Sequence, residues 1–271
     1  MQRHDSWQPT RYNTNVASNI SYEQPLNERV RTFLRVEFLF EQLNHYIDDP
    51  NEWNNRNAIS ALIEVIDFLS RLDIKTELIK ELERHSVIIS SLENTPGVDI
   101  NRLKMIIGEI SDCLKTLRDA SFQPGQALRQ NEFITSIKQR ASIPGGTCNF
   151  DLPGYYFWLK SQNVNKTGQL KEWKGDISII HRAVKLALEL IRNSTNPVMA
   201  TAIRGFYQQG IETDAPCQLI RVKLPAGSGY YPEISGGKHR FTIRFMEQPS
   251  MNQRPSQTSD DVEFELHCCS L

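Results

Sequence analysis

Polar and apolar residues alternate one by one along residues 238–246, whose sequence is KHRFTIRFM. Successive side chains of a β-strand point to opposite faces, so every second residue of such a segment shares a face. The apolar face would hold Phe241, Ile243 and Phe245. The opposite face would hold Lys238, Arg240, Thr242, Arg244 and Met246. We therefore predict a strand that packs into a core on one side and presents basic side chains on the other.

Two arginines of this strand, Arg240 and Arg244, would lie about 13 Å apart at roughly 3.3 Å per residue. This spacing suits an extended or helical acidic peptide better than a small substrate. The alternative is an ordinary solvated strand face, whose charges discourage pairing at a sheet edge. Both interpretations fit the segment taken alone.

Before this region, apolar residues recur every three or four positions, as they do in amphipathic helices. The spacing predicts helices over about 27–47, 57–72, 73 to beyond 82, 99–120, 127–140 and 176–192. Asn27 and Asp73 are the expected N-caps of the first and third helices. We expect Asp151 to cap a short helix with Pro153 in its first turn, and residues 165–168 to lie in a polar loop.

After residue 196 the period changes to two, which is typical of strands. Strands are expected near 199–208, 218–224, 230–234, 240–246 and 262–267. No segment between them is long enough and has the apolar periodicity to form a crossover helix, so antiparallel pairing is expected. The predicted fold class is α+β, with an N-terminal helical bundle domain followed by a C-terminal β-rich domain.

This pattern divides the chain into four predicted parts. Residues 1–21 are poor in aliphatic residues and are expected to form a disordered extension. A helical domain over 22–145 and a helical connection over 146–196, packing between the domains, would follow. The β-rich domain would cover 197–271.

Composition narrows the function classes. The 31 Lys and Arg residues nearly balance the 32 Asp and Glu residues, which argues against a dominant nucleic-acid role. The five cysteines are scattered, form no C-x-x-C pair and fit a reducing cytoplasm. The first residues contain no apolar signal region, and no run of eighteen apolar residues occurs. We therefore expect a soluble cytoplasmic protein that neither enters nor spans a membrane.

Signatures of catalysis are missing from the sequence. It contains neither of the glycine-rich loops that bind phosphate and dinucleotides, and no H-E-x-x-H motif. Its six histidines are dispersed along the chain. The adjacent Cys268 and Cys269 have no second ligand pair with zinc-site spacing. We expect no cofactor and no metal; a catalytic site could still assemble from distant residues, but nothing in the sequence points to one.

Five blocks of sequence resemble the ZapD family, the Z-ring-associated protein D family of bacterial cell division. They are PLNERVRTFLR at 25–35, RLDIKTELIKELER at 71–84, SIPGGTCNFDLP at 142–153, GFYQ at 205–208 and HRFTIRFM at 239–246. The resemblance spans about residues 22–269. Residues 1–21, 51–56 and 251–259 lie outside it.

The resemblance implies a cytoplasmic, dimeric adaptor without enzymatic activity, located at midcell with the division ring. Such an adaptor binds the C-terminal peptide of the tubulin-like GTPase FtsZ and cross-links FtsZ filaments into bundles. The family's basic pocket is similar in sequence to the segment around Arg240 and Arg244. The further candidates that the resemblance implies are Arg35 and Arg71, followed by Arg129 and Lys238.

Two residues weaken the assignment of the family's basic binding residues to positions of this chain. The chain has Glu132 where the family can carry a further basic residue, which weakens an extension of the basic surface along that helix. Arg35 lies between Phe33 and Val36, so it has the alternative of pairing within the molecule.

Two other function classes fit parts of the sequence. A single-stranded nucleic-acid-binding protein could use a strand on which arginines and aromatic rings alternate. However, Phe241 and Phe245 are expected on the core face, opposite the arginines. An enzyme whose site assembles from distant residues is the third hypothesis.

Overall fold

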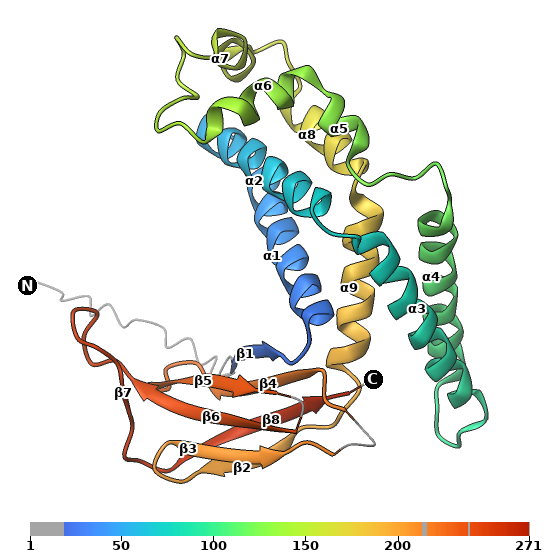
Figure 1. Ribbon diagram of the computed structural model, residues 1–271, viewed down its shortest axis with the longest axis vertical. Helices are drawn as coiled ribbons and strands as arrows, with labels where there is room; N and C mark the ends of the chain where they lie inside the picture. Colours follow the sequence, from blue (N-terminus) through green and yellow to red (C-terminus); the bar gives the residue numbers. More distant parts are fainter. Residues whose placement is uncertain (1–18, 213–215, 238, 271) are drawn as a thin grey trace, which may run out of the picture. The chain divides into compact units, whose positions relative to one another are not determined.

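The computed structural model describes residues 19–212, 216–237 and 239–270 (Figure 1). Helices occupy the chain from residue 28 to residue 192, and antiparallel strands follow, so the predicted α+β class is confirmed. The chain forms two compact units. Among the described residues, the helical unit contains 25–196, 216–219 and 268–270, and the sheet unit contains 19–24, 197–212, 220–237 and 239–267.

The helical unit is built around α9. Its helices are α1 Glu28–Asp48, α2 Glu52–Ser70, α3 Ile74–Ser91, α4 Ile100–Arg118, α5 Gln126–Gln130, α6 Glu132–Ala141, α7 Pro153–Lys160, α8 Lys166–Gly175 and α9 Ser178–Arg192, and a 3₁₀ turn covers Leu92–Asn94. Helix α9 contacts α1, α3 and α4 and buries an apolar face that includes Ile180, Val184 and Leu188. Burial of these aliphatic side chains supplies the main driving force for packing the unit.

Local signals define several helix ends as expected. The side chain of Asn27 accepts the amide of Val30 at 2.8 Å, and that of Asp73 accepts the amide of Thr76 at 3.2 Å. Both predicted N-caps are therefore confirmed. Helix α2 begins at Glu52, earlier than expected, because Asn51 caps it.

Other helical predictions were wrong. The helix expected over 127–140 is divided into α5 and α6, because Asn131 ends the first and caps the second. Asp151 does not cap α7, which follows Leu152 and starts with Pro153. The expected loop at 165–168 instead begins α8, because Asn165 accepts the amide of Gly168 at 2.9 Å.

A buried carboxylate ties α1 to α3. Glu81 is fully buried and accepts hydrogen bonds from Arg29 at 2.6 Å and from Arg84, while His85 Nε2 lies 3.0 Å away. Burial alone would raise the pKa of Glu81, but the hydrogen bonds of His85 and Arg84 outweigh it and hold this pKa far below its usual range. Glu81 is therefore an ionised group that the guanidinium groups of Arg29 and Arg84 compensate.

The sheet unit contains two packed sheets. The strands are β1 Asn19–Pro25, β2 Val198–Ala202, β3 Phe206–Gly210, β4 Leu219–Pro225, β5 Tyr230–Gly236, β6 Arg240–Glu247, β7 Ser256–Gln257 and β8 Val262–Cys269. One sheet has the order β1-β4-β8-β2 and the other the order β3-β6-β5, with β7 paired to β6. Phe264 of the first sheet lies 5.0 Å from Phe245 and 5.3 Å from Tyr207 of the second, measured between ring centroids. These rings form the core between the sheets.

The structure corrects two predictions about strands. The single strand expected over 199–208 is two strands, β2 and β3, in different sheets, because the chain turns through positive φ angles at Arg204 and Gly205. Residues 19–21, expected in the disordered extension, begin β1, which lies beside β4 and carries an ion pair of 2.7 Å between Glu23 and Arg221. The rest of that predicted extension, residues 1–18, lies outside the described residues.

Gly205 is required where β2 turns into β3. Its φ is +67°, and an added Cβ would lie 2.7 Å from Thr258 Cγ2 and 2.8 Å from Thr258 O. We expect Gly205→Ala to lower the free energy of unfolding by about 1–3 kcal/mol, because strain and overlap add. Gly227→Ala is the matched control, since Gly227 also has a positive φ but open space around it. Equal losses in the two variants, measured by urea denaturation, would show that the contact with Thr258 has no effect.

A basic sheet face as the candidate functional site

Strand β6 shows the predicted alternation. Phe241, Ile243 and Phe245 are at most 1% exposed, whereas Arg240 and Arg244 are exposed. Since β6 is the central strand of its sheet, pairing with β3 and β5 holds its backbone on both sides. The predicted division into a core face and a basic face is therefore confirmed.

The basic face consists of the side chains that share the outer side of this sheet. Strand register places on it Phe206, Gln208 and Gly210 of β3, Tyr231, Glu233 and Ser235 of β5, and Arg240, Thr242, Arg244 and Met246 of β6. Cross-strand partners of this kind have Cβ atoms about 4.5–5.5 Å apart. The face thus combines cations, small polar groups and apolar side chains within one rigid sheet.

The two arginines of the basic face are available for a ligand. No ion pair or side-chain hydrogen bond joins Arg240 or Arg244 to another residue in the described part of the chain. Their guanidinium groups present donors in a planar fork that matches the geometry of a carboxylate. The arrangement therefore fits recognition of acidic groups along about 13 Å of strand.

The remaining candidates from the sequence lie elsewhere or outside the described residues. Arg35 on α1 and Arg71, directly after α2, belong to the helical unit and are exposed. Neither has an ion pair or side-chain hydrogen bond with a described residue, so the structure does not contain the pairing considered for Arg35. Lys238 lies outside the described residues.

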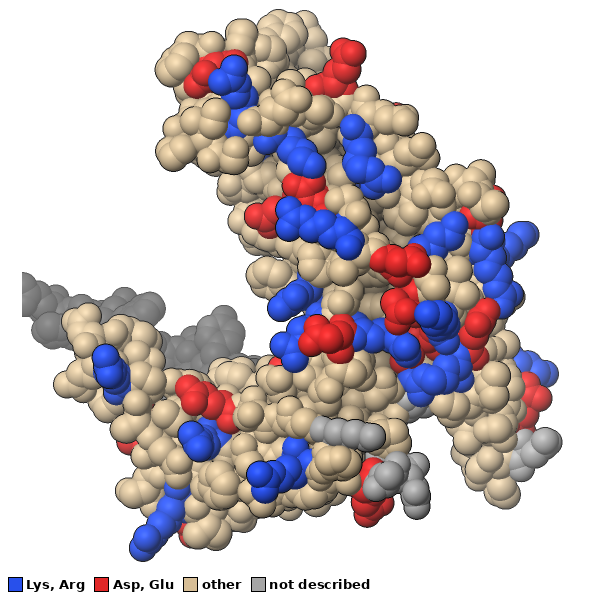
Figure 2. All heavy atoms as spheres, viewed as in Figure 1, with Lys and Arg blue, Asp and Glu red and all other residues tan. Residues whose placement is uncertain are grey.

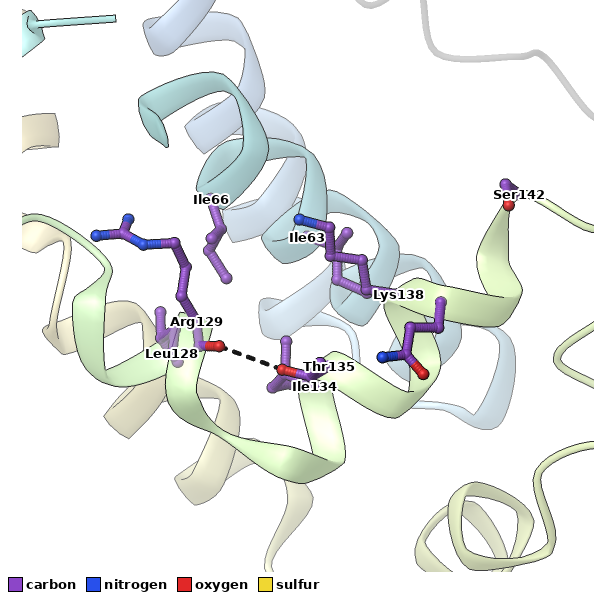
Figure 3. Close-up of a pocket in the computed structure, with 9 residues that line it drawn as sticks. Ile63, Ile66, Leu128, Arg129, Ile134, Thr135, Lys138 and Ser142 are labelled. Atoms are coloured by element: carbon purple, nitrogen blue, oxygen red, sulfur yellow. Dashed lines mark hydrogen bonds between the residues drawn. The ribbon is translucent and has the colours of Figure 1, made fainter. Parts of the chain in front are cut away.

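Arg129 borders a groove of the helical unit between α2 and the α5–α6 pair (Figure 3). The groove encloses about 460 Å³ over an apolar floor of Ile63, Ile66, Leu128 and Ile134. Both cations at its rim are engaged, since Arg129 donates to the carbonyl of Pro124 at 2.8 Å and Lys138 pairs with Asp67. The groove is therefore less suited to a charged ligand than the basic face.

On the side of the helical unit visible in Figure 2, acidic and basic side chains are intermingled. The ion pairs of the helical unit include Arg118 with Glu83 at 2.5 Å and Lys160 with Glu52 at 2.7 Å. Such exposed pairs neutralise each other locally and contribute little to stability. Arg35 and Arg71 of the same unit are also exposed without an ion pair to a described residue, so unpaired arginines are not confined to β6.

The comparisons with known proteins agree on one family. The model of the ZapD family, described as "Cell division protein", matches residues 34–244. The chain belongs to the ZapD family.

Curated ZapD proteins match almost the whole chain. The cell division protein ZapD of Methylococcus capsulatus is 39% identical over 256 residues, which is 94% of this chain and 100% of that protein. The ZapD proteins of Enterobacter sp. and Coxiella burnetii are 37% and 35% identical, again over 94% of this chain and 100% of each relative. Membership in the ZapD family supports a role in cell division.

Neither a membrane-spanning helix nor a cluster of metal-binding side chains occurs in the described residues of this ZapD-family chain. No helix there is long and apolar enough to cross a membrane. Within the same residues, no group of three or more His, Cys, Asp or Glu side chains could hold a metal ion.

Sequence reasoning missed the neighbours of Arg244 in this ZapD-family chain. Phe206 of β3 and Glu233 of β5 lie directly opposite it, and Tyr231 lies opposite Met246. The alternation within β6 identifies its own faces, but it does not specify which residues of other strands lie beside them. Strand register would have been needed to find them.

Proposed function

We propose that this chain is a cell division adaptor that binds the C-terminal tail of FtsZ through the basic face. As a homodimer it cross-links FtsZ filaments into bundles and thereby promotes assembly and stability of the Z-ring. It acts in the cytoplasm at midcell, without catalysis and without a cofactor. One observation carries the proposal: Arg240 and Arg244 are exposed, aligned on one strand and unpaired among the described residues.

The chemistry of the basic face supports this ligand. Arginine binds carboxylates with two parallel hydrogen bonds, and such charge-assisted bonds are stronger than neutral ones. Phe206, which is 40% exposed, and Met246 offer apolar contacts beside Arg244. An acidic peptide segment with a few apolar residues complements both kinds of group.

Cross-linking follows from the number of sites. A homodimer would carry two basic faces and could hold tails from two filaments. Each filament presents many tails, so binding at one site raises the effective concentration for the next. Modest affinity at each face is then sufficient for bundling.

Single-stranded nucleic acid is the alternative ligand. Stacking of bases requires accessible rings. Phe241 and Phe245 are only 1% and 0% exposed, so the aromatic residues of β6 itself are unavailable. This burial removes the β6 rings from stacking and leaves Phe206 and Tyr231 of the neighbouring strands as the rings on the basic face.

Salt dependence tests the electrostatic basis of the proposal. Because exposed charges are screened within about 8–10 Å at physiological salt, raising NaCl from 50 to 500 mM should weaken binding of an FtsZ tail peptide about tenfold. Fluorescence anisotropy with a labelled peptide measures this change. An affinity that does not respond to salt would contradict recognition by the basic face and favour an apolar site, such as the groove between α2 and α5–α6.

A further inference from the structure

Two cysteines that are far apart in the sequence meet where β4 and β8 lie side by side. These strands are neighbours in one sheet. The amide of Gln218 donates to the carbonyl of Cys269 at 2.7 Å, and its side chain donates to the carbonyl of Ser270 at 3.3 Å. Gln218 follows Cys217, and Cys269 follows Cys268. Backbone pairing therefore holds Cys217 and Cys268 close to each other.

The thiols of Cys217 and Cys268 interact directly. A side-chain hydrogen bond joins them, and both are free thiols. Both residues are partly exposed, so a small solute can reach their sulfur atoms. Cys269 is different, because it is buried and its thiol donates to the carbonyl of Arg192 at 3.8 Å. The thiol pair of the folded protein is thus Cys217 with Cys268 and not the two cysteines that are adjacent in the sequence.

The hydrogen bond gives the two sulfur atoms different reactivity. Donation from the Cys217 thiol lowers the pKa of Cys268, although burial opposes this shift. The same contact, together with burial, raises the pKa of Cys217, which therefore stays protonated. Because the thiolate is the nucleophilic form of cysteine, Cys268 is the more reactive partner. An accessible, easily ionised cysteine beside a second thiol is the arrangement found in cysteines that respond to oxidants.

We propose that Cys217 and Cys268 form a reversible modification site, which a hydroperoxide converts into a disulfide. The Cys268 thiolate attacks one peroxide oxygen and becomes a sulfenic acid, while the O–O bond breaks and the displaced hydroxide or alkoxide takes up a proton. The Cys217 sulfur then attacks the Cys268 sulfur. The S–S bond forms, and the sulfenic hydroxyl leaves as water with the proton of Cys217. Two thiols are oxidised, and the peroxide is reduced to two water molecules or to water and an alcohol.

The modification links the residue two positions before β4 to β8 near its end. Cellular thiols reverse it by thiol–disulfide exchange. It is compatible with the reducing cytoplasm expected from the sequence, because disulfides in that compartment are usually transient.

The experiment maps disulfides in the full-length protein after treatment with hydrogen peroxide, up to the concentration that oxidises Cys148. Remaining thiols are blocked with N-ethylmaleimide, the protein is digested without a reducing agent, and tandem mass spectrometry identifies the linked cysteines. The variants are Cys217→Ser and Cys268→Ser, with Cys148→Ser as a matched control. Cys148 is also partly exposed, but its thiol donates to the carboxylate of Asp151 at 3.4 Å. Circular dichroism verifies folding.

The wild type and Cys148→Ser should yield a peptide that links Cys217 to Cys268, and dithiothreitol should remove this link. Both variants of the pair should lose it. In Cys217→Ser the sulfenic acid of Cys268 has no resolving thiol, so dimedone should label Cys268 in this variant and not in the wild type. If a variant does not fold, the map of the wild type still decides. Wild-type protein in which Cys217 and Cys268 stay unlinked while Cys148 is oxidised, or in which Cys268 links to Cys269 or to a second molecule instead, overturns the inference.

Discussion

Replacing both Arg240 and Arg244 by glutamate is expected to reduce the affinity for an FtsZ tail peptide by at least about 100-fold. Each replacement removes a hydrogen bond to a charged group, worth about 1.5–3 kcal/mol, and adds a repulsive charge. The fold should remain intact, because both side chains are exposed and have no partner among the described residues. Anisotropy measures the affinity, and circular dichroism reports the fold.

A matched double variant separates this local effect from a change in total charge. Arg102→Glu with Lys104→Glu makes the same change in charge on the exposed side of α4. We expect this control to bind the peptide within about threefold of wild type, since Arg102 and Lys104 lie on α4 and not on the basic face. Wild-type affinity in the Arg240/Arg244 variant, or an equal loss in the control, would contradict recognition by the basic face.

The largest effect on stability is expected at Glu81. Its removal leaves Arg29, Arg84 and His85 without the carboxylate that they share. Breaking a buried ion pair costs about 3–5 kcal/mol. We expect Glu81→Ala to lower the free energy of unfolding by about 3 kcal/mol, the low end of this range. The side chains of Arg29 and Arg84 are 33% and 36% exposed, so water can solvate them once the carboxylate is removed. Urea denaturation followed by helical circular dichroism measures the loss.

Glu83→Ala is the control for this prediction. Glu83 lies on the same helix and pairs with Arg118, but its side chain is 45% exposed, so its removal should cost less than about 1 kcal/mol. Equal losses for Glu81→Ala and Glu83→Ala would contradict the role given to the buried carboxylate.

The stabilisation by Glu81 should also depend on pH. The folded state holds the pKa of Glu81 below its ordinary value of 4.5, so the ionised carboxylate stabilises the fold at neutral pH. This contribution is fully present above that ordinary value and is lost as the pH falls toward the folded pKa. The stability difference between wild type and Glu81→Gln should therefore shrink below about pH 4.5. A difference that grows on acidification would contradict the assigned direction of the pKa shift.

Features set by local physics could be predicted from the sequence. The burial of Phe241, Ile243 and Phe245 follows from the two-residue period of a strand, whichever strands lie beside it. The caps at Asn27 and Asp73 are equally local, because each side chain binds an amide three residues ahead. The same locality made Arg240 and Arg244 recognisable as one face.

Features set by distant contacts could not be predicted in this way. Helix α8 has little apolar periodicity, and its packing includes a hydrogen bond of 2.6 Å from Trp158 to Gln169 and stacking of Trp173 on Trp158. The break between β2 and β3 depends on which sheet each strand joins. In the sequence, a single glycine within an otherwise continuous strand-like segment was not a sufficient signal to predict this break. Phe206 and Glu233 enter the site through strand register, which is likewise non-local.

Co-sedimentation with FtsZ filaments tests the central claim most directly. Wild-type protein should pellet with FtsZ polymers and increase the bundled fraction, whereas the Arg240→Glu/Arg244→Glu variant should stay in the supernatant. Deleting the C-terminal tail of FtsZ should abolish pelleting of the wild type to the same extent. Co-pelleting that survives tail deletion, or wild-type bundling by the double variant, would contradict the claim that the basic face of β6 captures the FtsZ tail.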